Sequence, residues 1–99
     1  MELSKEIQQW HDKIKKDYAI EDSGGLSLLM IAAESYERMR QAQEIIQSEG
    51  LIIEDRFKQK RNHPATVIEK DSRNALIQAL QRLNLEVEIN QIEKSKFKL

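Results

Sequence analysis

The chain has 99 residues, of which 39% are hydrophobic and 33% are charged, with a net charge of −1. This length suits one modest hydrophobic core, and the composition is typical of a soluble globular protein rather than of a disordered one. The longest mainly apolar run, residues 26–33, is far shorter than the roughly 20 residues that a transmembrane helix needs. The absence of cysteine excludes disulfides, cysteine-based zinc sites and thiol nucleophiles. We therefore expect a cytoplasmic protein with no membrane contact.

Apolar residues at helical spacing predict two helices in the first half of the chain. The first spans about 4–18, and its apolar stripe consists of Leu3, Ile7, Trp10, Ile14 and Tyr18. The glycine pair at 24–25 is interpreted as a hinge before the next helix. The second helix spans about 23–49 and stops at Gly50, a residue type that favours the end of a helix.

A short extended segment and a third helix are predicted in the second half. β-branched residues followed by turn-forming ones predict a short β-hairpin or an extended loop at about 51–60. The third helix spans about 64–83, since Pro64 is tolerated at a helix start, and Asn84 can take the left-handed conformation that ends it. Its predicted buried stripe consists of Ile68, Ala75, Leu76, Ala79, Leu80 and Leu83. The predicted fold class is therefore all-α, with three main helices.

The C-terminal segment has no clear helical pattern. Residues 86–89 alternate polar and apolar side chains, as a strand does, and chain ends are commonly frayed. We therefore predict one helical domain, residues 1–85, followed by a tail of uncertain order, residues 86–99.

Two groups of basic residues are candidate DNA contacts. Residues 21–50 carry a formal charge of −4, whereas residues 51–74 carry +2. The densest cluster places four cations within six residues: Arg56, Lys58, Lys60 and Arg61. Because such side chains attract phosphate, this cluster is the first candidate DNA contact. The second candidate is a set on the first helix, which would contact phosphates if the first two helices form a helix-turn-helix-like unit: Lys13, Lys15 and Lys16.

The beginning of the second helix is apolar on nearly every side. An element of this kind needs cover all round, either from the other helices of the chain or from a second subunit. We take four residues as a candidate oligomer interface: Leu26, Leu28, Met30 and Ile31.

No catalytic or metal-binding constellation is predicted. Glu69 and Asp71 lie two positions apart and so cannot share a helix face, and His63 is interpreted as a cap or turn residue. His11 is placed on the polar side of the first helix. Trp10 and Phe57 are interpreted as core or hairpin packing residues rather than as base-stacking platforms. The three glycines form no phosphate-binding loop. We expect no enzyme activity, no metal and no cofactor.

Four patterns occur in a fixed order between residues 22 and 86. They are the helical run 29–38 continuing to Gln43-Glu44, the helix end Ser48-Glu49-Gly50-Leu51, the run 55–60 leading to His63-Pro64-Ala65, and the run 68–73 leading to Leu80-Gln81-Arg82-Leu83. In this order and spacing the chain resembles the small subunit of a phage DNA-packaging terminase. It departs from that family's pattern at Lys58 and Asn84, where the family often has glycine.

This resemblance implies a helical subunit, encoded by a phage or prophage, that assembles into a ring in the bacterial host cell. It also implies binding to double-stranded viral DNA and to a large terminase subunit that carries the ATPase and the nuclease. Because the net charge is close to zero, we expect DNA binding to depend on assembly, since linked weak sites bind with combined strength. The alternative is a non-catalytic helical adaptor or structural protein that binds a protein partner and whose basic loop is incidental.

Overall fold

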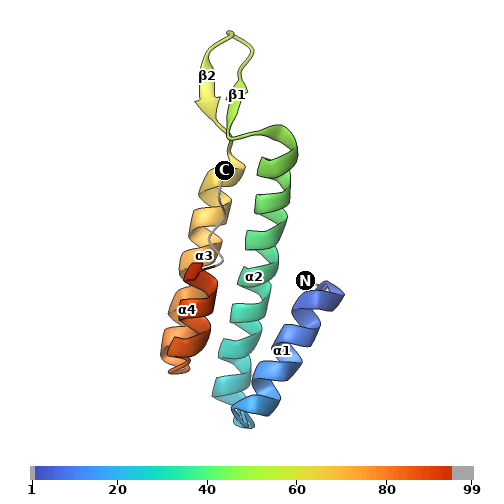
Figure 1. Cartoon of the computed structure of the whole chain (residues 1–99), viewed down its shortest axis with the longest axis vertical. Helices are drawn as coiled ribbons and strands as arrows, with labels where there is room; N and C mark the ends of the chain where they lie inside the picture. The colour runs from blue at the N-terminus through green and yellow to red at the C-terminus, as the bar shows by residue number, and fades with distance from the viewer. Residues whose placement is uncertain (1, 95–99) are drawn as a thin grey trace.

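The computed structural model describes residues 2–94, which form four helices and one two-stranded hairpin. The elements are α1 (Lys5–Asp17), α2 (Ser23–Glu49), β1 (Ile52–Glu54), β2 (Lys60–Asn62), α3 (Ala65–Arg82) and α4 (Glu86–Lys94). Figure 1 shows α2 and α3 side by side as a long pair, with the hairpin projecting beyond one end. The molecule measures 52 × 25 × 19 Å. The predicted all-α class with a short hairpin is confirmed.

Side-chain caps begin the first two helices. The Ser4 hydroxyl accepts a hydrogen bond from the backbone N–H of Ile7, and the Asp22 carboxylate accepts one from Gly25 at 2.8 Å. Gly24 and Gly25 lie in the first turn of α2, so the predicted hinge is wrong. A Cβ atom at Gly25 would lie 2.8 Å from the Asp22 carboxylate, which explains the glycine as a close approach rather than as a flexible joint.

Left-handed residues end α1 and α3. Ala19 has φ 49° and Asn84 has φ 60°, and in each case the following backbone N–H reaches back across the last turn. At α3 this bond joins Leu85 N–H to the carbonyl of Leu80 at 2.9 Å. Both ends are Schellman motifs, and the predicted role of Asn84 is confirmed.

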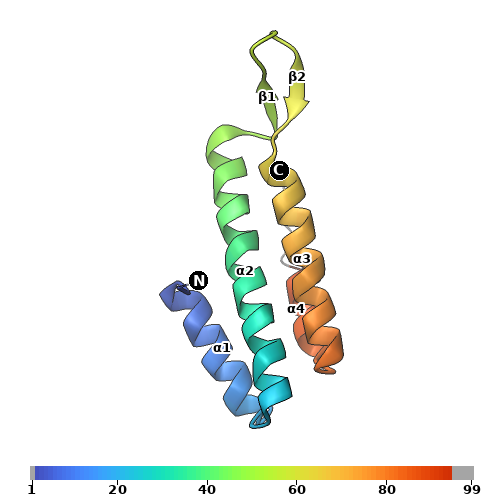
Figure 2. The ribbon, with the colours of Figure 1, turned by 180° about the vertical axis from the view of Figure 1, so that it is seen from behind.

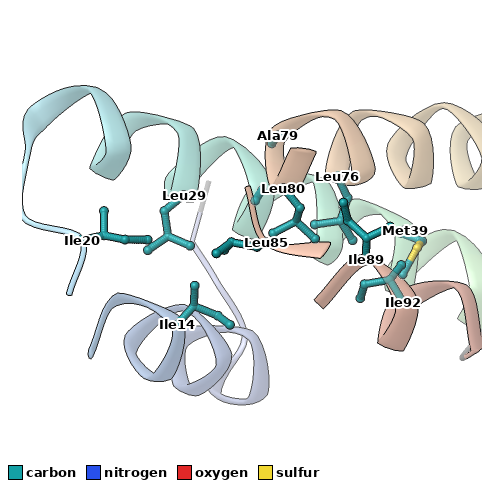
Figure 3. Close-up of a cluster of buried hydrophobic side chains, with 11 residues drawn as sticks. Ile14, Ile20, Leu29, Met39, Leu76, Ala79, Leu80, Leu85, Ile89 and Ile92 are labelled. Carbon is teal, nitrogen blue, oxygen red and sulfur yellow. The ribbon is translucent and has the colours of Figure 1, made fainter. Parts of the chain in front are cut away.

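The main core joins side chains from all four helices (Figure 3). It lies toward the end of the α2–α3 pair that is away from the hairpin. Its buried residues are Ile14, Ile20, Leu29, Ala32, Met39, Leu76, Ala79, Leu80, Leu85, Ile89 and Ile92. A smaller cluster near the hairpin contains only α2 and α3 residues of the helical body: Ala42, Ile46 and Ala65. The two halves of the helix pair therefore differ in thickness, because α1 and α4 pack beside only the half away from the hairpin (Figures 1 and 2).

The segment predicted to be a tail is a helix over residues 86–94, and its strand-like alternation was misleading. Leu85, Ile89 and Ile92 are buried in the main core, and their spacing of four and three is that of one helical face. Four alternating residues fit a strand and a short helix equally well, so burial against the core decides the conformation. Residues 95–99 of the predicted tail lie outside the described residues.

Two predicted orientations are wrong. Ile68 is 51% exposed, because the buried face of α3 near the hairpin is formed by Ala65, Glu69 and Ser72 instead. His11 is only 9% exposed, since it follows Ile7 by one helical turn and shares its buried face. Within residues 2–94, no helix combines the length and the apolar character that crossing a membrane requires.

A polar contact ties the beginning of α1 to the middle of α2. The backbone N–H of Ser4 donates a hydrogen bond to the buried carboxylate of Glu37, and Arg40 forms an ion pair with Glu6 at 3.2 Å. A carboxylate at this position also interacts favourably with the N-terminal end of the α1 dipole. The two contacts set where α1 lies along α2.

Substitution of Ala19 tests how much its left-handed conformation lowers the free energy of unfolding. Ala19 is exposed, so Ala19→Gly removes no buried contact but relieves the steric cost of positive φ for a residue with a Cβ atom. We expect stabilisation by about 0.5–1 kcal/mol, measured by urea denaturation. Asn84→Ala is the matched control and should shift the free energy of unfolding in the opposite direction. A destabilised Ala19→Gly variant would contradict this account.

Candidate nucleic-acid interface

The basic cluster lies on the β-hairpin. β1 and β2 pair antiparallel with Ile52 opposite Asn62 and Glu54 opposite Lys60. The second strand is therefore 60–62, and the hairpin extends two residues beyond the predicted 51–60. The connecting loop, residues 55–59, is at the far end of the molecule from the main core (Figure 1).

Asp55 organises the loop. One oxygen of its carboxylate accepts hydrogen bonds from the backbone N–H groups of Phe57, at 2.8 Å, and Gln59, at 3.0 Å. The other oxygen accepts a hydrogen bond from Nε of Arg61 at 2.7 Å. The backbone hydrogen bonds from Gln59 and Phe57 and the side-chain hydrogen bond from Arg61 lower the pKa of Asp55 below its ordinary value. A single ionised side chain thus holds both sides of the turn.

Lys58 adopts the left-handed conformation at this turn, with φ 62°. Its backbone N–H donates to the carbonyl of Asp55 at 2.9 Å, which closes a tight turn. The family that the sequence resembles often has glycine at this position, and the backbone geometry explains why. The departure at Lys58 therefore preserves the turn and adds a positive charge to it.

The four predicted cations of the cluster do not have equal surroundings. Arg61 is paired with Asp55, whereas the guanidinium of Arg56 lies over the ring of Phe57, 4.9 Å from its centroid. Lys58 and Lys60 are exposed. Residues 51–62 carry a net charge of +2, because Glu54 and Asp55 offset two of the four cations. The structure thus brings the four together on one projecting element.

His63 joins the base of the hairpin to both long helices. Its Nδ1 accepts a hydrogen bond from the backbone N–H of Ala65 at 3.0 Å, and its Nε2 faces the carboxylate of Glu49 at 3.1 Å. Accepting at Nδ1 requires the neutral tautomer that donates from Nε2. The His63 backbone N–H also donates to Leu51. The sequence predicts that His63 is a cap or turn residue. Pro64 is the capping position of α3, and His63 is the turn residue before it, whose side chain ties the hairpin to α2 and α3.

The second predicted set of cations, on α1, is not brought together with the first. Lys13 forms an ion pair with Asp17 at 2.8 Å, and that hydrogen bond raises the pKa of Lys13. Residues 12–21 have no net charge, because three acidic side chains balance Lys13, Lys15 and Lys16. This end of α1 is at the opposite end of the molecule from the hairpin (Figure 1). The α1 set is therefore a weaker electrostatic site than the hairpin.

The four predicted interface residues do not form one surface. Leu26 is half-buried against the core of its own chain, and Leu28 lines a shallow depression beside Tyr18. Met30 and Ile31 are 40% and 50% exposed. Only Met30 and Ile31 are thus free to contact another chain through much of their surface.

Sequence reasoning missed a group of exposed apolar residues near the hairpin: Ile45 on α2, Ile52 on β1, and Val67 and Ile68 on α3. We call this group the neck. Ile45, Val67 and Ile68 lie in the turns of α2 and α3 nearest the hairpin, and α1 and α4 do not extend along that end of the helix pair (Figure 2). Ile45 and Ile31, which lies outside the neck, are fourteen residues apart, about four helical turns, so they lie on the same side of α2. This spacing is the signal from which the sequence could have predicted the exposed position of Ile45.

The residues considered for acid–base or metal chemistry are also kept apart. Glu69 is buried on α3, where Arg73 lies 3.7 Å from its Oε1, whereas Asp71 is exposed and His63 is at the hairpin base. That Glu69 oxygen has no hydrogen-bond partner within the described part of the chain. Over residues 2–94, no group of three or more His, Asp or Glu side chains is arranged to hold a metal ion.

Removal of the Asp55 carboxylate tests the organisation of the loop. Asp55→Ala should lower the hydrogen-exchange protection of Phe57 and Gln59 amides without changing protection in α2. Acid should have the same effect. The pKa of Asp55 in the folded protein is below its ordinary value, so the ionised carboxylate stabilises the folded loop above the ordinary pKa. This stabilisation is lost as the pH falls through the pKa of the folded state. Glu54→Ala, at the exposed neighbour, is the control. Unchanged protection in Asp55→Ala would show that the loop does not depend on Asp55.

Comparison with known proteins agrees with the resemblance in the sequence. The family model described as phage terminase, small subunit, matches residues 22–89, which is more than half of the chain. The matched region begins at the cap of α2, contains the hairpin and α3, and ends within α4. No curated protein and no solved structure gives a significant match. The chain therefore belongs to the phage terminase small-subunit family.

Proposed function

We propose that the protein starts the packaging of viral DNA by assembling into a closed oligomer that binds duplex DNA through its β-hairpins. Membership of the terminase small-subunit family supports a role in phage DNA packaging. The oligomer would act in the cytoplasm of the bacterial host and present the DNA to the large terminase subunit. Its own part is regulatory, as is general for small subunits of this family.

The observation that carries the DNA-binding proposal is the projecting, ordered and cationic hairpin. Arg56 and Lys58 lie on the loop that Asp55 organises, and Lys60 follows directly as the first residue of β2, so the three cations lie within five residues. Pre-ordered cations lose less conformational entropy when they contact phosphate than cations on a flexible loop do. Two antiparallel strands also match the width of the major groove.

Assembly supplies the strength that one hairpin lacks. The whole chain carries −1, and one hairpin carries only +2. Each phosphate contact contributes modestly, so a monomer should bind DNA poorly at physiological salt. Several hairpins on one oligomer would bind the same duplex together, and linked sites exceed the strength of each alone.

The exposed apolar residues of α2 and the neck support contact between copies of this chain. Met30, Ile31 and Ile45 on α2, with Val67 and Ile68 on α3, are at least 40% exposed. Covering such side chains stabilises an interface by about 25 cal/mol per Å² of apolar surface removed from water. A second copy seated along this side would leave each hairpin projecting from the assembly.

Substitution of Arg56, Lys58 and Lys60 tests the DNA site. Arg56→Gln, Lys58→Gln and Lys60→Gln together should weaken duplex binding at least tenfold at low salt. They should also flatten the dependence of log K on log salt by about 0.9 for each phosphate that the variant no longer neutralises. Arg61 is left unchanged because its ion pair with Asp55 holds the loop. Fluorescence anisotropy over a range of salt concentrations measures both effects.

The matched control replaces the other three predicted cations: Lys13→Gln, Lys15→Gln and Lys16→Gln. This variant removes the same charge from the opposite end of the molecule and should bind DNA nearly as well as the unaltered protein. If the α1 variant loses binding and the hairpin variant keeps it, the proposed site is wrong.

Charged substitutions on α2 test assembly. Ile31→Glu with Ile45→Glu would place two carboxylates on the proposed contact, where burying a charge is costly. We expect a reduction in mass toward that of one 11.6 kDa chain, measured by light scattering, with weaker DNA binding as a consequence. Val87→Glu, at a 62% exposed position of α4, is the control and should leave the mass unchanged. An unaltered protein that is monomeric and indifferent to DNA would favour the adaptor alternative instead.

A further inference from the structure

Within the described residues, packing does not explain the position of Phe57. It is 66% exposed, the largest exposed fraction among the large hydrophobic side chains of residues 2–94. The sequence suggested a packing residue, but the loop that carries it projects beyond both long helices (Figure 1). Its ring contact is with Arg56, whose guanidinium lies 4.9 Å from the ring centroid. An aromatic ring held at such a tip is placed to contact something outside the subunit.

The loop presents this ring in a defined orientation. The backbone N–H of Phe57 donates to the Asp55 carboxylate at 2.8 Å, and the next residue, Lys58, is held in the left-handed conformation. Arg56 over the ring limits its rotation through a cation–π contact. The ring is therefore already restricted in the free protein, so it loses less conformational entropy when it binds.

The surroundings of the ring favour a nucleic-acid partner. Cations precede and follow Phe57 directly, at Arg56 and Lys58. An apolar protein pocket that accepted the ring would have to remove water from both charges, which is costly. In DNA, the base pairs offer flat apolar faces and the phosphates beside them bind the two cations. Apolar side chains inserted between base pairs are a known means of opening a base step.

We propose that Phe57 is a base-stacking residue that inserts its ring into a base step of the duplex bound by the hairpin. This inference rests on the proposed function, because Arg56, Lys58 and Lys60 must first bring the hairpin to DNA. The cations hold the phosphates, and the ring opens the stack between them. Packaging would thus begin on DNA that the protein has locally deformed, with a preference for steps that unstack easily, such as TA and CA.

Phe57→Ala in the full chain tests the proposal on a short duplex that carries 2-aminopurine at successive positions. Unstacking raises 2-aminopurine fluorescence, so the unaltered protein should give a rise at one or a few positions and Phe57→Ala should give none. Affinity should fall about 5- to 150-fold if the ring stacks on one base in the unaltered complex. The slope against salt should stay the same, because Phe57 carries no charge. Phe57→Trp should retain both the affinity and the fluorescence rise.

The matched control is Val87→Ala, which truncates a 62% exposed apolar side chain on α4 and should change neither readout. Phe57→Ala with unaltered affinity and an unaltered fluorescence rise would overturn the inference. So would a reduced oligomer mass in Phe57→Ala without DNA, since the ring would then contact another protein chain. If the unaltered protein binds no duplex, the proposed function fails too; if binding needs the cations but not Phe57, only this inference fails.

Discussion

The packing of α2 against α3 is the contact on which the rest of this structure depends. Leu29 on α2 and Leu76 and Leu80 on α3 are completely buried, and burying each such side chain stabilises the fold by roughly 2 kcal/mol. α1 and α4 have short apolar faces and gain stability by covering this pair at one end. The hairpin is the connection between the two long helices, so its position is set by where they end.

The unequal thickness of the helix pair separates two kinds of surface. At one end, four helices enclose the core, and the cations of α1 are balanced by neighbouring carboxylates. At the other end, Ala42 and Ala65 allow α2 and α3 to approach, while Ile45 and Ile68 point outward. Stability is thus concentrated at the first end. The hairpin and the neck, for which we propose partners, lie at the second end, and the proposed contact between copies also includes Met30 and Ile31 near the first.

The hairpin is an ordered projection although it lies beyond the core. Asp55 satisfies two loop N–H groups and one arginine, and His63 bonds to both flanking helices. These polar contacts replace the apolar packing that a two-stranded hairpin alone lacks. A small chain of near-zero net charge can in this way present a concentrated positive charge, while its remaining surface stays close to neutral or acidic.

Hydrophobic periodicity determined α1, α2 and α3 within one or two residues, and residue type determined the left-handed end at Asn84, because these are local properties of the chain. The dense cations at 56–61 were also visible in the sequence. Tertiary structure alone decided that 86–94 is a helix, that Ile68 faces outward and that Arg61 is paired with Asp55. Those outcomes depend on which surfaces meet across distant parts of the chain, and spacing along one segment carries no information about its partner.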